Sequence, residues 1–176
     1  MPQPAQKPGR SRQDYATPPE FLIAVKKLLG IREFSHDFAA DESNTVAATY
    51  YSEAENALMQ TSDKWARMIG ATGWGWLNPP FGHIAPWAQA CFECAADGGG
   101  HVAFLVPAGV GANWFRDWVH AKSRVLLLNG RLSFNGIAPF PKDCILCLYG
   151  PDVTIGYDVW NWRTGNLSVS GNAREE

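Results

Sequence analysis

The alternation of short apolar runs with helix-forming segments constrains the fold of this chain more than any other feature. The stretches "HVAFLVPA" (101–108), "RVLLLNG" (124–130) and "DCILCLYG" (143–150) are dominated by apolar residues, as is typical of strands buried on both faces. Helical patterns occur in "IAPWAQACFECAADGGG" (84–100) and "ANWFRDWVHAK" (112–122). This rhythm predicts an α/β fold with a mostly parallel sheet and helices on both faces.

A helix is also predicted in "TPPEFLIAVKKLLG" (17–30), where its start and end are both marked. Thr17 is expected as the N-cap, Pro18 as the first helical residue, and Glu20 as the partner of Thr17 in a T-x-x-E capping box. Gly30 is expected to end the helix.

Four further elements are predicted from less regular patterns. Residues 33–41 ("EFSHDFAAD") predict a strand with Asp37 and Asp41 at its carboxyl end, and residues 45–53 a second strand. A helical stretch runs through Trp65 and Met68, and residues 73–77 ("GWGWL") form a strand that leads into the corner discussed below. Residues 154–162 are expected to form an edge strand.

The length of 176 residues fits one domain with a proper core. Residues 1–14 are rich in Pro, Gln, Lys, Arg and Ser and are expected to form a flexible basic arm. The folded domain is expected over residues 15–150, followed by a partly ordered extension over 151–176. No apolar run approaches the length of a membrane span, the N-terminus lacks the apolar region of a signal peptide, and the net charge of −2 does not by itself predict a nucleic-acid binder.

The cysteines form two C-x-x-C pairs, Cys91 with Cys94 and Cys144 with Cys147. The spacing between the pairs is far longer than in compact zinc ribbons. The second pair lies in a predicted strand, so its side chains should point to opposite faces. We interpret all four as reduced core thiols rather than metal ligands, which indicates a reducing compartment, the cytoplasm.

The stretch "WLNPPFG" places Asn78, Pro79, Pro80 and Phe81 directly after an apolar strand. Neither proline can donate a ladder hydrogen bond, so the segment is a rigid corner. In a parallel sheet this corner, Asp37 and Asp41 would share the edge where ligands bind. The Asn78 carboxamide and the Pro79 carbonyl offer two acceptors, and Phe81 offers a stacking face. These groups suit the N6 amine of an adenine extruded from a duplex; the alternative is a simple strand-terminating turn.

The ordered set "YATPPEFL", "FSHDFAADESN", "WLNPPFG", "VAFLVPA", "WF" and "GRLSF" resembles the phage-type DNA N6-adenine methyltransferase family over Tyr15–Tyr149. The resemblance implies a Rossmann-like fold that uses S-adenosyl-L-methionine and no metal. It implies methyl transfer to the N6 amine of a flipped adenine in double-stranded DNA, in the bacterial cytoplasm and from a phage or prophage gene.

The resemblance also implies roles for particular residues. The catalytic corner is Asn78, Pro79, Pro80 and Phe81. The implied cofactor-binding residues are Tyr15, Thr17, Pro18, Asp37, Ala39, Asp41, Asn44 and Asn56, of which Asn56 stands where the family commonly has an aspartate. DNA contacts are expected from Arg131 and Phe134 in the loop "NGRLSF", and from Arg10 and Arg12 in the basic arm. His83 and Trp87 follow the corner and are expected to border the base pocket, with core packing as the alternative for Trp87.

Structural alternatives remain open for several of these residues. Asp41 and Asn44 would cap a loop, Arg131 would be a surface residue, and Phe134, Trp114 and Phe115 would belong to the core. Two rival functions also remain. The first is a glutamine-amide protein methyltransferase, and the second is a DNA-binding or inhibitory protein that kept the fold and lost turnover. The target sequence and the oligomeric state are left open, with base reading assigned to residues 59–72, residues 135–142 or the arm.

Overall fold

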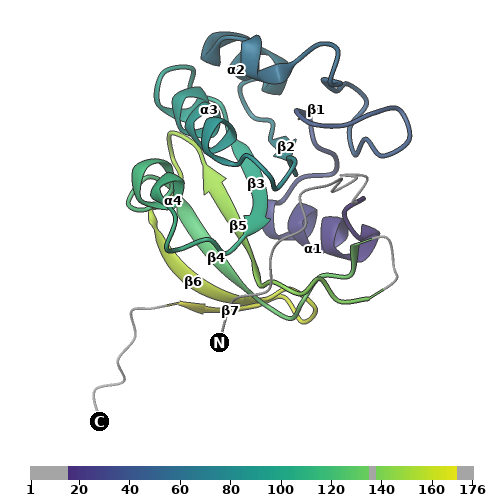
Figure 1. Cartoon of the computed structure of the whole chain (residues 1–176), viewed down its shortest axis with the longest axis vertical. Coiled ribbons are helices and arrows are strands. Elements are labelled where there is room, and N and C mark those ends of the chain that lie inside the picture. Colours follow the sequence, from purple (N-terminus) through teal and green to yellow (C-terminus); the bar gives the residue numbers. More distant parts are fainter. Residues whose placement is uncertain (1–15, 135–137, 170–176) are drawn as a thin grey trace, which may run out of the picture.

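The computed structural model describes residues 16–134 and 138–169. Within these residues the chain forms one seven-stranded sheet in the order β1-β2-β3-β5-β4-β6-β7 (Figure 1). The strands are β1 (His36–Asp37), β2 (Gly75–Leu77), β3 (Val102–Pro107), β4 (Arg124–Asn129), β5 (Cys144–Tyr149), β6 (Gly156–Asn161) and β7 (Asn166–Val169). The helices are α1 (Pro19–Leu29), η1 (Ala57–Met59), α2 (Ser62–Ile69), α3 (Ala85–Ala96) and α4 (Asn113–Trp118).

The sheet is mixed, so the prediction of a mostly parallel sheet is wrong. The pairs β1–β2, β2–β3 and β4–β6 are parallel, whereas β3–β5, β4–β5 and β6–β7 are antiparallel. A parallel neighbour requires a long crossover, usually a helix, but the described residues between β4 and β5 (130–134 and 138–143) contain no α-helix, and β5 runs antiparallel to β4. The sequence of β5 does not show in which direction the strand runs, because all six of its residues are buried and apolar runs of this kind occur in both orientations.

Strand direction places five carboxyl ends at one edge of the sheet. β1, β2, β3, β4 and β6 all run the same way, and β5 and β7 run against them. We call the edge at which these five strands end the carboxyl edge. It carries the segments 38–61, 78–84, 108–112, 130–134, 138–143 and 162–165.

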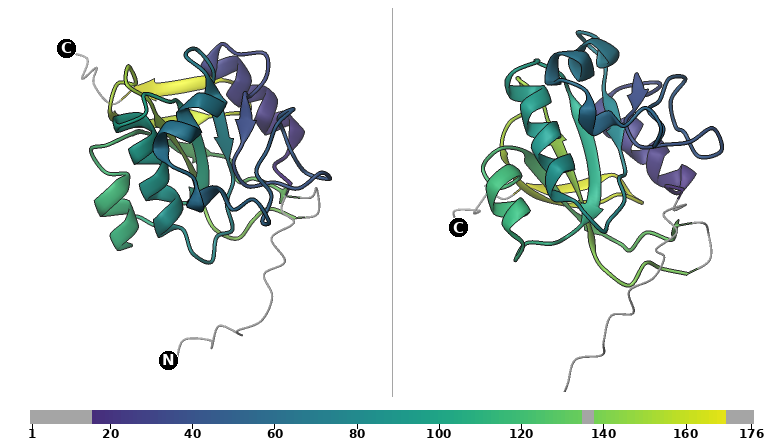
Figure 2. Two further views of the ribbon diagram at one scale, coloured as in Figure 1. Left: turned by 90° about the horizontal axis from the view of Figure 1, so that it is seen from above. Right: turned by 45° about the horizontal axis from the view of Figure 1, so that its top comes forward.

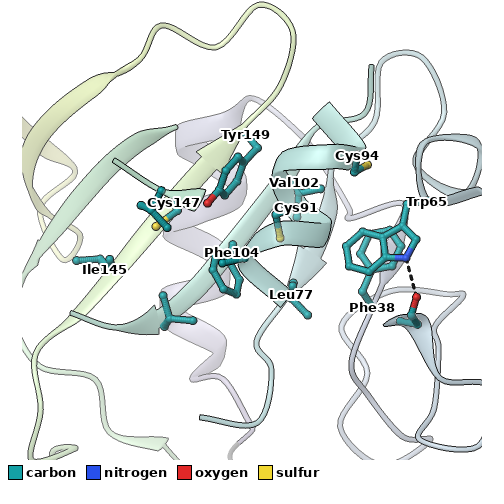
Figure 3. Packing of buried hydrophobic residues seen from close by; sticks show 14 of the residues in the cluster. Phe38, Trp65, Leu77, Cys91, Cys94, Val102, Phe104, Ile145, Cys147 and Tyr149 are labelled. Atoms are coloured by element: carbon teal, nitrogen blue, oxygen red, sulfur yellow. Dashed lines mark hydrogen bonds between the residues drawn. The ribbon is translucent and has the colours of Figure 1, made fainter. Parts of the chain in front are cut away.

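Hydrophobic clusters cover both faces of the sheet, and helices lie on both, as predicted. One face packs against α1 through Phe21, Trp76, Leu126 and Trp160. The other packs against α2, α3 and α4, and Figures 2 and 3 show these helices and the buried residues beneath them. Each layer is an apolar sheet face covered by helix, which is the arrangement the alternating pattern favours.

The four cysteines are free and buried, and burial raises the pKa of each thiol. Cys144 and Cys147 lie in the two different clusters, so the prediction that they face opposite sides is confirmed. Among the described residues no group of three or more His, Cys, Asp or Glu side chains could hold a metal ion. None of the described helices is long and apolar enough to cross a membrane.

The start of α1 differs from the predicted capping box. Pro18 is the N-cap with φ −56° and ψ 131°, and no side chain caps the helix. A residue before a proline is forced out of the helical region, so Pro19 keeps Pro18 extended and delays the helix by one residue. Gly30 ends α1 with φ 68°, as expected. The Thr17 hydroxyl therefore does not cap α1, and it accepts a hydrogen bond from another residue, described below.

Two other strand predictions are wrong. Residues 45–53 form only the isolated bridges Phe34↔Ala47 and Asp37↔Tyr50, because β1 itself is two residues long and offers no ladder to extend. Residues 154–162 contain β6, which is not an edge strand, since β7 pairs along its outer side. The helices α2 and α3 and the strands β2 to β5 lie in the predicted segments.

Candidate active site

The rigid corner follows β2 directly, and its first residue contacts the segment that precedes α1. Asn78 Nδ2 donates a hydrogen bond to Thr17 Oγ1 at 3.1 Å. Asn78 is half-buried, Pro79 buried and Pro80 exposed, while Phe81 is half-buried. Thr17 therefore holds the Asn78 carboxamide in one orientation across 61 residues of sequence.

Asp37 ends β1 beside the corner and organises the loop that follows. Its Oδ1 accepts a hydrogen bond from the Ala39 amide at 3.2 Å and its Oδ2 from the Val46 amide at 3.1 Å. The side chain is buried. Asp37 thus fixes both ends of the segment 39–46, whose middle lines the cavity described next.

A cavity of about 570 Å³ opens at the carboxyl edge between this loop and the corner. Its size is within the range of about 300–1,000 Å³ typical of small-molecule sites. It is lined by Phe38, Ala39, Ala40, Asp41, Asn44, Tyr51, Ser52, Glu53, Asn56, Ala57, Asn78, Pro80 and Trp87. A smaller space beside it is lined by Thr17 and Asp37 together with Ala39, Asn44 and Asn78. Of the eight residues that the resemblance assigns to the cofactor, Ala39, Asp41, Asn44 and Asn56 therefore line the large cavity, and Thr17 and Asp37 line the smaller space beside it.

Asp41 and Asn44 both cap the loop and line the cavity. Asp41 Oδ1 accepts from the Ser43 amide at 2.7 Å, and the Asp41 amide donates to Asn44 Oδ1 at 2.9 Å. The Ser43 hydrogen bonds hold the pKa of Asp41 below its usual range. Capping and cavity lining are thus compatible roles.

Asn56 lines the cavity as the N-cap of η1, with φ 45°. This left-handed conformation is one that Asn and Asp adopt more readily than other non-glycine residues. The backbone position alone therefore accounts for a short polar side chain here.

Trp65 supports the inner wall of the cavity from behind. Its ring stacks on Phe38 with a centroid distance of 3.8 Å, and its Nε1 donates to the Ala57 carbonyl at 3.0 Å (Figure 3). Phe38 and Ala57 both line the cavity. The indole thus holds two segments of the wall together.

Sequence reasoning missed Phe38, Tyr51, Ser52 and Glu53 as lining residues. Tyr51, Ser52 and Glu53 follow the short bridge at Tyr50, where the chain returns to the carboxyl edge. The run "YYSEAEN" (50–56) is rich in polar side chains, which is a feature of a binding loop. Because residues 45–53 were interpreted as a strand, nothing indicated that Tyr51, Ser52 and Glu53 line the same cavity.

Phe81 belongs to an aromatic cluster with the loop after β4. Its ring centroid lies 6.0 Å from that of Phe134 and 5.6 Å from that of Phe140, and the latter two are 5.4 Å apart. Phe134 is buried, and Arg131 is exposed and ion-paired to Asp143 at 3.3 Å. The loop that the resemblance assigns to DNA thus contacts the corner directly.

The remaining predicted residues lie as follows. Pro18 is buried at the start of α1 and is absent from the lining of both spaces. His83 is exposed, Trp87 lines the cavity, Phe115 is buried and Trp114 packs partly buried beside it. Tyr15, Arg10 and Arg12 lie outside the described residues.

His36 and Asp37 are adjacent in β1, and burial shifts their pKa values in opposite directions. Burial raises the pKa of Asp37 from 3.8 to about 6. It lowers the pKa of His36 from 6.5 to about 4, against the smaller effect of the Glu55 charge. The stability contributed by protonated Asp37 is lost as pH rises from 4 to 6. The stability contributed by neutral His36 is present above pH 6.5 and is lost as pH falls toward 4.

We therefore expect Asp37→Asn to make the free energy of unfolding rise more steeply with pH than in the wild type. Between pH 4 and pH 6.5 the added rise should be about 2 kcal/mol, because the opposing contribution of Asp37 is gone. His36→Gln should show the reverse, a free energy of unfolding that rises less steeply with pH than in the wild type over the same interval. Urea denaturation at a series of pH values measures both, and profiles parallel to the wild type would contradict the expectation.

Comparison with known proteins bears on this site. A family model described as "DNA N-6-adenine-methyltransferase (Dam)" matches residues 5–143. A search of curated proteins finds no match. The matched segment includes the corner, the cavity and the loop after β4, and it ends just before β5.

Proposed function

The chain belongs to the DNA N-6-adenine-methyltransferase (Dam) family, and from this premise we propose that it transfers a methyl group to the N6 amine of adenine in double-stranded DNA. The observation that carries the proposal is the position of Asn78. Its carboxamide is fixed by Thr17 at the carboxyl edge and lies in the lining of the large cavity. A side chain that can accept hydrogen bonds from an amine thus lines a cavity large enough for a small molecule.

The family generally uses S-adenosyl-L-methionine, and the residues around the cavity suit that molecule. The lining combines apolar surfaces at Phe38, Ala39 and Ala57 with the polar side chains of Asn44 and Glu53. An adenine ring requires the former, and ribose hydroxyls and an amino-acid end require the latter. When bound, the cofactor supplies an electrophilic methyl group. Residues Ala39, Asp41, Asn44, Ser52, Glu53 and Asn56 would hold it.

The amine needs help from the protein because its lone pair is delocalised into the adenine ring. Asn78 accepts one of its hydrogens and the Pro79 carbonyl accepts the other, which raises electron density on the nitrogen. Because positive charge builds on the nitrogen only during transfer, these acceptors act mainly in the transition state.

Phe81 provides the surface on which an extruded adenine stacks. It is half-buried, and Phe134 and Phe140 pack beside its ring. These contacts fix the orientation of the ring before the base arrives. The proposed base pocket is therefore preorganised by the loop after β4.

An assay with tritiated S-adenosyl-L-methionine tests the proposal. The purified protein is given duplex DNA, a protein extract, or neither, with and without EDTA. We expect label in the DNA alone, recovered as N6-methyladenine after digestion, at a rate that EDTA does not change. Label in protein would instead favour a glutamine-amide methyltransferase, and DNA binding without label would favour a silent DNA-binding protein.

A further inference from the structure

The turn between β6 and β7, residues 162–165, lies at the same edge as the proposed active site. β6 runs parallel to β4, so both strands end at the carboxyl edge. Figure 1 shows this turn beside the segment that follows β4, below α1. The turn lies beyond residue 143, where the family match ends. Nothing in the family match therefore assigns it a role.

The turn is joined to the loop after β4 by two hydrogen bonds. Trp162 Nε1 donates to the Gly130 carbonyl at 2.8 Å, and Arg163 Nη2 donates to the Arg131 carbonyl at 3.2 Å. Gly130 has φ 107°, and a Cβ atom there would lie 2.1 Å from Arg163 Nη1. Because Gly130 has no Cβ atom, the Arg163 guanidinium can pack directly against the backbone of the loop at this position.

The Arg163 guanidinium is exposed and held in place. It lies 4.3 Å from the centroid of the Trp162 ring. In the part of the chain that the structure describes, Arg163 forms no ion pair. Its Nη2 donates a hydrogen bond to the Arg131 carbonyl. The remaining N–H donors of the guanidinium form a rigid fork that suits a phosphate group.

Two other cationic residues are close to Arg163 in the structure. Arg131 is exposed next to it, although paired with Asp143. A groove of about 590 Å³ between α1 and the turn is lined by Lys27 and Arg163, with Glu20 as its acidic member. Around the turn three cationic side chains thus stand against two acidic ones, Glu20 and Asp143, and the Arg163 guanidinium has no ion-pair partner among the described residues.

We propose that the turn at residues 162–165 binds the phosphate backbone of the duplex whose adenine enters the Asn78 pocket, with Arg163 as the principal contact. The identity of the partner rests on the proposed function. The loop after β4 links the two sites, because Arg131 contacts Arg163 and Phe134 contacts Phe81. A phosphate contact at the turn would fix the register of the duplex without reading its sequence.

The test measures binding of a fluorescent duplex by anisotropy over a range of salt concentrations. For Arg163→Gln the slope of log affinity against log salt should be shallower by about 0.9, the value for one phosphate contact. Affinity at 0.1 M salt should fall about 5- to 10-fold, equally for different duplex sequences. Arg163→Lys keeps the charge and should recover most of the slope.

Arg32→Gln is the matched control. Arg32 is exposed in the segment between α1 and β1, which leads into the opposite end of the strands from the turn. It should leave the slope unchanged. A wild-type slope in folded Arg163→Gln would overturn the proposal, as would an equal loss in Arg163→Lys, which would indicate a purely structural role. Methylation by the same preparations is scored separately, so that a wild-type protein that binds DNA without methylating it would refute the proposed function alone.

Discussion

Replacing Asn78 with alanine should reduce kcat for DNA methylation by about 100-fold or more, with little change in cofactor affinity. The magnitude is that of removing one group which stabilises charge in a transition state. The loss should appear in kcat because the acceptor acts when the amine becomes positive, and less when the cofactor binds. Single-turnover methylation and titration calorimetry with S-adenosyl-L-methionine measure the two effects.

Two companion variants distinguish the acceptor from its support. Asn78→Asp keeps an acceptor oxygen and should retain more activity than Asn78→Ala. Thr17→Val removes the hydroxyl that receives the 3.1 Å hydrogen bond from Asn78. It should reduce kcat less severely, because the carboxamide remains but loses its fixed orientation. Methylation by Asn78→Ala at the wild-type rate would contradict the prediction and indicate that the corner is only a strand-terminating turn.

Asp37→Ala should weaken cofactor binding at least tenfold and lower the free energy of unfolding by about 2 kcal/mol. The variant leaves the Ala39 and Val46 amides without their acceptor, and a buried amide without a partner costs about 1–3 kcal/mol. Relief of burying the carboxylate, whose pKa is raised to about 6, offsets part of that loss. The loop 39–46 then loses its anchors, and the cavity it lines loses its shape. Calorimetry and urea denaturation at pH 7 measure the two quantities.

Asp158→Ala is the control for a general effect of removing a buried carboxylate. Asp158 is buried in β6 and accepts a hydrogen bond from Arg124 Nε at 2.8 Å, away from the cavity lining. Its loss should lower stability and leave cofactor affinity unchanged. Wild-type cofactor affinity in Asp37→Ala would place the cofactor site elsewhere in the molecule.

Much of the candidate site followed from local patterns in the sequence. The corner at Asn78 was predicted because two prolines exclude regular structure whatever surrounds them. Asp37 and Asp41 were predicted at the same edge as the corner because parallel strands end at one edge of a sheet, and the structure pairs β1 parallel to β2. Tyr51 and Glu53 were missed because their position depends on how the chain returns after a two-residue strand, which no periodic pattern records.

Thr17 shows how a local pattern can be outweighed. The T-x-x-E motif favours a capping box, but Pro19 keeps Pro18 extended and moves the helix start away from Thr17. The hydroxyl then receives the hydrogen bond from Asn78. The double proline already indicates that Thr17 does not cap the helix. It does not indicate that the Thr17 hydroxyl accepts a hydrogen bond from Asn78.

The sequence by itself determined the segments that form α1, α3 and β3 to β5, the opposite faces of Cys144 and Cys147, and the rigid corner. These properties depend on the periodicity of side chains and on backbone restrictions, which act over a few residues. Only the tertiary structure decided that β5 runs antiparallel between β3 and β4, that Thr17 holds Asn78, and that Arg163 packs against Gly130. These depend on contacts between distant segments. An apolar strand buried on both faces satisfies the hydrophobic effect equally well in either direction, so the choice is made by the connections and neighbours of the strand.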